Sequence, residues 1–188
     1  MIYICIPHTP DRRGRLNDTV ASIRENTKIP HCIITYENNY IGWANAIHDM
    51  IQDIEGLIWI VGSDVIVKEG CVYELYRKYR ETFKDTGGIV EPFNELHGSQ
   101  LSQHPFGDAH LLRKYIHRGY KHCFADNELT ERAYAEGKLD YAPNALIDHR
   151  HAVNHKAPMD AGYEFSLNPK NYEIDLALYK ERKQNGYN

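Results

Sequence analysis

Three short runs rich in β-branched residues alternate with segments in which apolar residues recur at helical spacing. The runs cover residues 2–6, 32–36 and 57–61, and each is followed by a proline or by polar, turn-forming residues. Strands that alternate with helices predict a parallel sheet with crossover helices on its faces. Ligands of such sheets bind beyond the carboxyl ends of the strands. We therefore expect a site built from residues 7–9, 36–38 and 62–64.

The alternation of strands and helices continues along the chain and becomes less regular after residue 91. Residues 92–106 carry turn formers with little periodicity, and a loop of this length in a compact domain is usually functional, so we expect substrate contact there. Residues 150–171 are polar and are expected to be irregular. Asp126 is the expected N-cap of a helix. Further helices are expected from about 16 to 26, around 47–54, and over 71–83, 111–118, 127–136 and 175–183, with strands over 88–91 and 141–147.

Composition excludes several classes of protein. The chain has 188 residues, which is close to one domain, and 42% apolar with 26% charged residues argues against disorder or a fibrous repeat. The net charge of −4 disfavours binding to a nucleic-acid backbone through overall charge, although a local basic groove stays open as an alternative.

Neither a membrane span nor export is predicted. The longest apolar run, residues 57–61, is far shorter than the roughly 20 residues that cross a bilayer. The amino terminus has no basic leader or small-residue cleavage site. Cys5, Cys32, Cys71 and Cys123 form no C-x-x-C pair, so we expect reduced thiols and a cytoplasmic protein.

Several motifs stand in an order that carries a family resemblance. They are Pro7 after the first strand, Glu37, Gly42-Trp43-Ala44-Asn45-Ala46-Ile47, Gly62-Ser63-Asp64, Asp126-Asn127-Glu128-Leu129 and His149. In this order they resemble the inverting family 2 glycosyltransferases, which have the GT-A fold. Two positions depart from the family: Gly62 replaces the first acid of the D-x-D element, and Ala125 replaces the glutamate that often precedes the base.

The resemblance implies a fold and a set of donor contacts. The fold is α/β, with a Rossmann-like, mostly parallel central sheet flanked by helices, as in nucleotide-diphospho-sugar transferases. Residues 1–188 would be one catalytic domain, with 150–188 as a C-terminal extension or lid. Glu37 would accept an N–H from the base, which favours uridine. The expected donor-binding residues are Pro7, His8, Thr9, Arg12, Glu37, Asn45, Ser63, Asp64 and Lys156.

The leaving group of a sugar nucleotide is a diphosphate whose charge grows as the glycosidic bond breaks, so the site needs a hard cation. Asp64 and His149 would supply an oxygen and a nitrogen ligand, with His151 as a weaker candidate. This mixture favours Mn²⁺ first and Mg²⁺ second. The alternative is that Asp64 only ends a strand and that these are ordinary histidines among the 11 in the chain.

An acceptor hydroxyl must lose a proton as it attacks, and Asp126 is the expected general base. Glu128 would share this work or orient the acceptor, or it would only favour the positive end of a helix. Trp43 and Phe106 are candidates to stack on acceptor sugar rings, although aromatic residues more often belong to the core.

The leading hypothesis is therefore metal-assisted transfer of a sugar, with inversion, from a UDP-sugar to an acceptor hydroxyl. The acceptor is a glycan, a protein, a lipid-linked intermediate or, as a minor alternative, a hydroxylated nucleobase in DNA. A different class also remains open: a nucleotide- or carbohydrate-binding module of the same fold that catalyses no reaction. The glycine at position 62, where the family has an acidic residue, favours this alternative. No oligomeric state is predicted.

Overall fold

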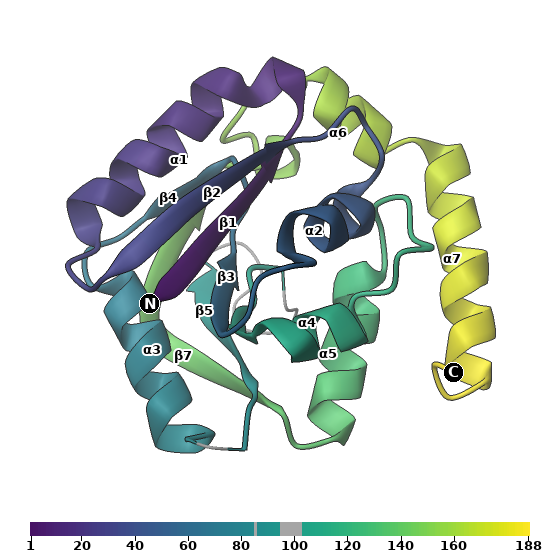
Figure 1. Ribbon diagram of the computed structural model, residues 1–188. Coiled ribbons are helices and arrows are strands. Elements are labelled where there is room, and N and C mark those ends of the chain that lie inside the picture. Colours follow the sequence, from purple (N-terminus) through teal and green to yellow (C-terminus); the bar gives the residue numbers. More distant parts are fainter. Residues whose placement is uncertain (85, 95–102) are drawn as a thin grey trace.

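A seven-stranded mixed sheet forms the centre of the protein (Figure 1). The computed structural model describes residues 1–84, 86–94 and 103–188. The strand order is β2-β1-β3-β6-β5-β7-β4. The strands are β1 Ile2–His8, β2 His31–Glu37, β3 Leu57–Ile60, β4 Val65–Val67, β5 Ile89–Asn94, β6 Phe106–Asp108 and β7 Leu139–His149.

Five strands, β1, β2, β3, β5 and β7, run in one direction. β1 pairs in parallel with β2 and β3, and β5 pairs in parallel with β7. β6 is antiparallel to both β3 and β5, and β4 is antiparallel to β7. The expected α/β fold with a mostly parallel sheet is therefore confirmed, while the two reversed strands, of three residues each, are additions to it.

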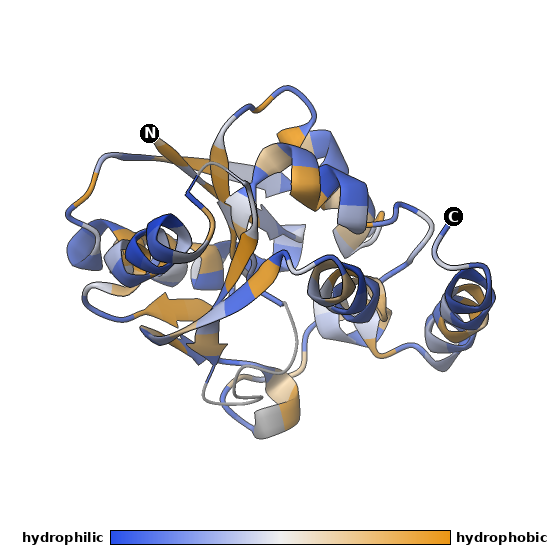
Figure 2. Ribbon diagram, turned by 90° about the horizontal axis from the view of Figure 1, so that it is seen from below, coloured by the Kyte–Doolittle hydropathy of each residue, from blue (hydrophilic) through white to orange (hydrophobic). Residues whose placement is uncertain are grey.

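Helices cover both faces of the sheet. α1 (Arg13–Asn26) and α3 (Cys71–Thr82) bury residues such as Ile23 and Leu75 against one face. On the other face, α2 (Trp43–Ile51), α4 (Ala109–Tyr115) and α5 (Ala125–Ala135) pack through residues such as Ile47 and Leu129. Seen along the sheet, apolar residues gather on the strands and on the helix faces turned toward them (Figure 2).

The C-terminal part is helical where the sequence suggested irregular chain. α6 (Ala161–Ser166) and α7 (Pro169–Gln184) follow short 3₁₀ helix η2 (Ala152–Asn154). The prediction for residues 150–171 was therefore wrong over most of its second half. Asp160 and Asn168 explain the helix starts, because their side chains accept hydrogen bonds from Tyr163 N and Lys170 N and so cap α6 and α7.

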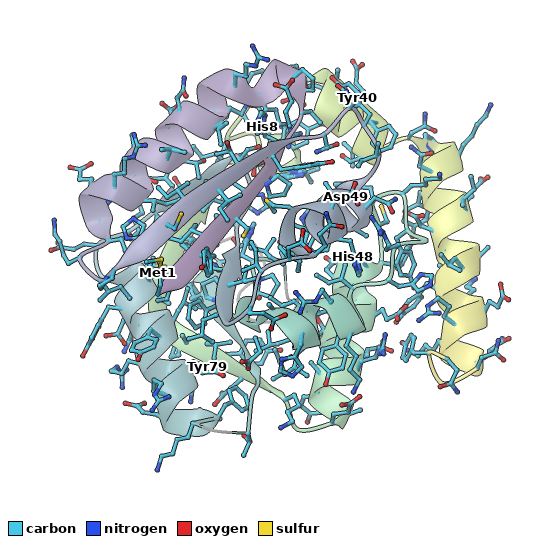
Figure 3. All side chains as sticks on the ribbon, viewed as in Figure 1. Met1, His8, Tyr40, His48, Asp49 and Tyr79 are labelled. Carbon is cyan, nitrogen blue, oxygen red and sulfur yellow. The ribbon has the colours of Figure 1, made fainter. Side chains whose placement is uncertain are left out.

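One end of the sheet collects the loops that follow the parallel strands. His8 at the end of β1 and Tyr40 beyond β2 lie at this end, opposite Met1 (Figure 3). Gly42 lets α2 begin close to the chain before α5: its φ is +93°, and a Cβ there would lie 2.1 Å from the carbonyl oxygen of Lys121. Glycine is thus required where Trp43 enters the site region.

No helix within the described ranges is both long and apolar enough to span a bilayer. All four cysteines are free thiols.

Candidate active site

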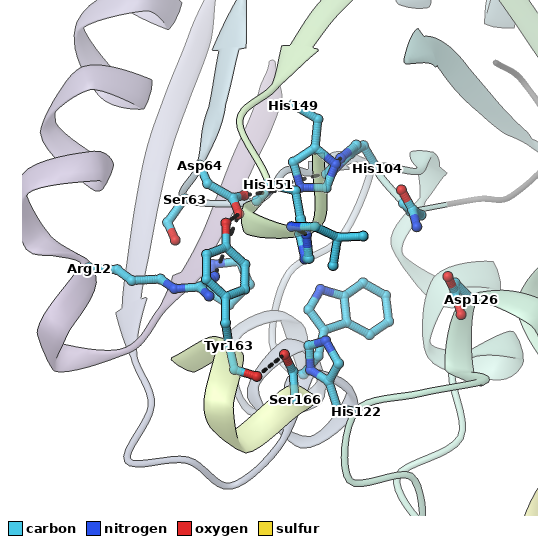
Figure 4. Close-up of a pocket in the computed structure, with 15 residues that line it drawn as sticks. Arg12, Ser63, Asp64, His104, His122, Asp126, His149, His151, Tyr163 and Ser166 are labelled. Atoms are coloured by element: carbon cyan, nitrogen blue, oxygen red, sulfur yellow. Dashed lines mark hydrogen bonds and ion pairs between the residues drawn. The ribbon is translucent and has the colours of Figure 1, made fainter. Parts of the chain in front are cut away.

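A cavity of about 320 Å³ opens at the carboxyl end of the sheet (Figure 4). Its walls come from the loop after β1, the turn after β3, the chain before β6, the start of α5, the end of β7, and α6. The lining residues are Pro7, Arg12, Trp43, Gly62, Ser63, Asp64, Gln103, His104, His122, Asp126, His149, His151, Val153, Tyr163 and Ser166.

Strand register brings Asp64 and His149 together. Val65 is paired with His149 in the antiparallel β4–β7 ladder, and Arg150 N donates to the Asp64 carbonyl at 2.8 Å. Nε2 of His149 then lies 3.3 Å from Oδ1 of Asp64, and both side chains are nearly buried. The expected convergence of these two residues follows from a strand pairing that the sequence did not reveal.

Asp64 is held as an ionised carboxylate. Burial by itself would raise its pKa, but hydrogen bonds and charge from His149, Arg12 and Tyr163 lower the pKa below its ordinary value. The Tyr163 hydroxyl donates to Oδ2 at 2.6 Å, and Nη1 of Arg12 is 3.6 Å from the same oxygen. Both carboxylate oxygens therefore have partners within the protein.

His104 is a site residue that sequence reasoning missed. Its Nδ1 accepts from Gly62 N at 3.3 Å, and its Nε2 lies 3.4 Å from Nδ1 of His149. Its backbone is fixed as well, because its N donates to Oε1 of Glu91 and its carbonyl accepts from the Trp59 indole. A single histidine in a stretch without periodicity gives no signal for such a position.

Asp126 lies across the cavity from Asp64 (Figure 4). It is not the N-cap, because α5 begins at Ala125 and its N-cap position is Phe124. The chain before the helix is fixed by buried Asp175 of α7, whose carboxylate accepts from the backbone N–H groups of three consecutive residues, 121–123. The general-base candidate thus sits in a first helical turn that the C-terminal helix holds in place.

Glu128 is not brought to the cavity. It is fully buried and accepts from Arg132, from Tyr120 and, through both oxygens, from Arg182 of α7. The structure thus corrects the expectation of a catalytic Glu128: its carboxylate joins α7 to α5 instead of facing an acceptor.

A smaller cavity of about 70 Å³ adjoins the first and is lined by several of the residues expected to bind the donor. Pro7, His8, Thr9 and Arg12 line it, together with Asn38, Tyr40, Gly42, Trp43, Ser63, His122, Gly162 and Phe165. Glu37 and Asn45 are not among the residues that line either cavity. Glu37 is exposed and paired with Arg13, and Asn45 donates to the Ile41 carbonyl.

Of the three remaining expected site residues, Phe106 and Lys156 line neither cavity. Phe106 is fully buried in β6 and packs edge-on against Tyr79, so it is a core residue instead of an acceptor platform. Lys156 pairs with Asp148 at 2.5 Å and lines a different pocket beside Arg15. His151 does line the main cavity, but its Nδ1 accepts from Val153 N and caps η2.

The expected substrate loop, residues 92–106, is only partly described. Residues 92–94 belong to β5, Gln103 and His104 line the cavity, and Phe106 begins β6. Residues 95–102 lie outside the described part of the chain.

No protein-family model and no curated protein matches this sequence. Solved structures do match, and the fold they share with this chain is the GT-A-like α/β fold that the sequence motifs suggested. Among them are structures of TarS from S. aureus. TarS 1–349 in complex with UDP-GlcNAc matches with a TM-score of 0.64 and 12% identity over 92% of this chain. Its complex with UDP matches with a TM-score of 0.60 and 11% identity over 96% of this chain.

The matches differ in length. This chain covers 36% of the longer TarS chain, and 59–71% of the 1–349 chains. At 11–12% identity the likeness establishes the fold, and activity has to be argued from the site.

Proposed function

We propose that this protein is a glycosyltransferase that moves a sugar, with inversion, from a UDP-sugar to an acceptor hydroxyl. One observation carries the proposal: Asp64, His149 and Asp126, from distant parts of the chain, line a single cavity at the carboxyl end of the sheet. The TarS structures of the same fold hold UDP-GlcNAc and UDP, which supports UDP-GlcNAc as the first donor to test.

In the proposed reaction, the acceptor oxygen forms a bond to the anomeric carbon while the bond from that carbon to the diphosphate oxygen breaks. Attack from the face opposite the leaving group inverts the configuration. The proton of the acceptor hydroxyl passes to the carboxylate of Asp126, and UDP leaves with the bonding electron pair. Asp126 suits this role because it faces the cavity from the side opposite Asp64, the expected position of the diphosphate.

The charges of the cavity wall fit a divalent cation. Arg12 is the one arginine or lysine among its described lining residues, against the carboxylates of Asp64 and Asp126. A diphosphate would add at least two negative charges to this wall, so a cation would balance them. Bound there, Mn²⁺ or Mg²⁺ would neutralise charge that develops on the leaving diphosphate.

Asp64 Oδ1 and His149 Nε2 would hold such a cation. Their separation of 3.3 Å is close to the roughly 3 Å between neighbouring ligands of an octahedral ion with bonds of about 2.1 Å. Within residues 1–84, 86–94 and 103–188, no three His, Cys, Asp or Glu side chains are grouped for a metal. The donor phosphates would therefore complete the coordination, without His151.

The remaining contacts divide between the two cavities. Residues 7–9 and the Asn38 region would hold the nucleoside in the smaller cavity, while Arg12 and Ser63, which line both cavities, would contact the diphosphate. Trp43 also lines both cavities and would stack on a sugar ring.

A donor screen tests the proposal. Purified protein is incubated with UDP-GlcNAc and other sugar nucleotides, with Mn²⁺ or with a chelator, and released nucleoside diphosphate is measured with a panel of glycan, protein, lipid-linked and DNA acceptors. We expect donor-specific release that Mn²⁺ stimulates and that Asp126→Asn lowers by about 10²–10⁴-fold. Nucleotide binding without release on any acceptor would instead support the non-catalytic module.

A further inference from the structure

Helix α6 supplies a second partner of Asp64, at the carboxylate oxygen that does not face His149. Tyr163 of α6 is 1% exposed, and its hydroxyl donates to Oδ2 of Asp64 at 2.6 Å, across 99 residues of sequence. The two carboxylate oxygens are therefore divided between two partners: Oδ2 faces Tyr163, and Oδ1 faces Nε2 of His149. A carboxylate held at one oxygen cannot turn without losing its alignment at the other.

The same tyrosine also fixes Arg12. The guanidinium carbon of Arg12 lies 3.8 Å from the centre of the Tyr163 ring, within the range of a cation–π contact. Nε and Nη2 of Arg12 donate to Asp160, the N-cap residue of α6, at 3.2 and 3.0 Å. Nη1 lies 3.6 Å from Oδ2 of Asp64. The guanidinium is thus held on its face by Tyr163 (Figure 4) and along its edge by Asp160.

Glycine makes this close approach possible. A Cβ on Gly162 would lie 2.8 Å from Nε of Arg12 and 2.9 Å from Oγ1 of Thr9. The backbone N–H of Gly162 donates to Oδ2 of Asp11 at 3.2 Å, which ties α6 to the 3₁₀ helix η1 (Pro10–Arg12) that carries Arg12. Within four residues, Asp160 caps α6, Gly162 allows Arg12 to approach closely, and Tyr163 donates its hydroxyl to Asp64.

We propose that Tyr163 is a positioning residue of the donor site: it keeps Oδ1 of Asp64 at His149 and keeps Arg12 in place to contact the donor's diphosphate. The inference rests on the proposed function and deepens it, because it makes the C-terminal segment part of the donor site. Without the Tyr163 hydroxyl, the Asp64 carboxylate is free to turn toward Arg12. Both groups then leave the positions from which they bind the donor.

Two variants separate the hydroxyl from the ring. Tyr163→Phe keeps the ring under Arg12 and removes the hydrogen bond to Asp64, whereas Tyr163→Leu removes both. A hydrogen bond to a charged group is worth at least about tenfold in an equilibrium constant, and a partly buried cation–π contact adds roughly threefold or more. The matched control is Tyr134→Phe, which alters an exposed tyrosine of α5 outside both cavities.

The measurement is calorimetric titration of each protein with UDP in the presence of Mn²⁺. We expect the dissociation constant for UDP to rise about tenfold in Tyr163→Phe and further in Tyr163→Leu, with one site per protein retained and Tyr134→Phe unchanged. A merely structural role would lower the number of binding-competent molecules and leave the dissociation constant unchanged, and that result would overturn the proposal.

Wild-type affinity in Tyr163→Phe would overturn it equally. If the wild-type protein itself binds no UDP, the proposed function fails and this inference fails with it, so the two failures are told apart by the wild-type titration.

Discussion

Nε2 of His149 lies 3.3 Å from Oδ1 of Asp64 because the residue after Asp64 is the ladder partner of His149. The contact depends on β4, a strand of three residues that runs against β7. The register fixes which side chain meets Asp64, since a shift of one residue would turn the opposite face of β7 toward it.

Gly62→Asp should lower activity, although it restores the carboxylate of a complete D-x-D element. A Cβ at position 62 would lie 2.7 Å from Oδ1 of Asp64 and 3.3 Å from Cε1 of His104. Oδ1 of Asp64, the atom that lies 3.3 Å from Nε2 of His149, would have to shift, and disturbing the surroundings of a metal ligand typically costs 10–100-fold in metal affinity or activity. Release of UDP from donor, measured with saturating Mn²⁺, should fall by at least about tenfold.

The controls for this prediction are also glycine substitutions. Gly62→Ala should cause most of the same loss, because the added Cβ and not the charge is responsible. Gly14→Ala, where the new Cβ meets nothing within 4 Å, should behave as wild type. Higher activity in Gly62→Asp would show that the site does accept a second carboxylate.

Glu128→Gln should destabilise the protein instead of impairing the chemical step. The substitution removes the counter-charge of Arg132 and Arg182, whose side chains are only 16% and 12% exposed. Breaking a buried ion pair costs about 3 kcal/mol, which corresponds to a fall in Tm of roughly 6–12 °C for a domain of this size. Thermal unfolding at pH 7 measures this, and kcat per folded molecule should stay near that of wild type.

The effect of Glu128→Gln also depends on pH. Burial alone would raise the pKa of Glu128, but hydrogen bonds from Arg182 and Tyr120 and the charge of Arg182 lower it below 4.5. The ionised native form therefore contributes stability above pH 4.5 that is lost as the pH falls through the lower native pKa. The difference in Tm between wild type and Glu128→Gln should reach its maximum by pH 7 and become smaller below pH 4.5. A difference independent of pH would contradict this assignment.

Glu91→Gln should stabilise the protein at neutral and alkaline pH. Glu91 is 1% exposed, and burial, with the charge of Asp126, raises its pKa well above 4.5. The native protein then binds more protons than the unfolded chain above pH 4.5, so stability falls as the pH rises through this window. Each pKa unit costs about 1.4 kcal/mol.

Differential scanning calorimetry at several pH values checks the prediction for Glu91. Glutamine cannot ionise, and its Oε1 can still accept from His104 N, as Glu91 does at 2.7 Å. The Tm of Glu91→Gln should exceed that of wild type by several °C at pH 8 (about 2–4 °C per kcal/mol), and the two should converge near pH 4. Glu131→Gln, which alters a partly exposed carboxylate with a lowered pKa, should not raise Tm at pH 8.

The parallel strands could be predicted from sequence because strands buried on both faces need nearly continuous apolar runs, as in Ile58-Trp59-Ile60, all fully buried in β3. β4 and β6 could not be predicted, because three residues show no periodicity. Position 107 in β6 requires glycine, because a Cβ on residue 107 would lie 2.3 Å from the carbonyl oxygen of Gly88. This close approach exists only in the folded protein, so the sequence gives no sign of it.

That Asp64, Asp126 and His149 line one cavity was predictable, because Asp64 follows a strand end and the other two belong to motifs that stand in the expected order. The site was not predictable where partners come from distant segments. Glu128 stands in the first turn of a helix, and the sequence there is the same whether the side chain faces solvent, a substrate or a distant residue. Its partner Arg182 lies 54 residues further along the chain. Tyr163 and His104 carry no local pattern that separates them from the other 13 tyrosines and 10 histidines.

In the proposed reaction, Asp64 lies on the donor side of the cavity and Asp126 on the acceptor side. Titration calorimetry with UDP and Mn²⁺ on wild type, Asp64→Asn and Asp126→Asn separates the two sides. We expect Asp64→Asn to weaken UDP binding at least about tenfold and Asp126→Asn to bind UDP as wild type does. Equal affinity of UDP for wild type and Asp64→Asn, with all three proteins folded, would contradict this expectation.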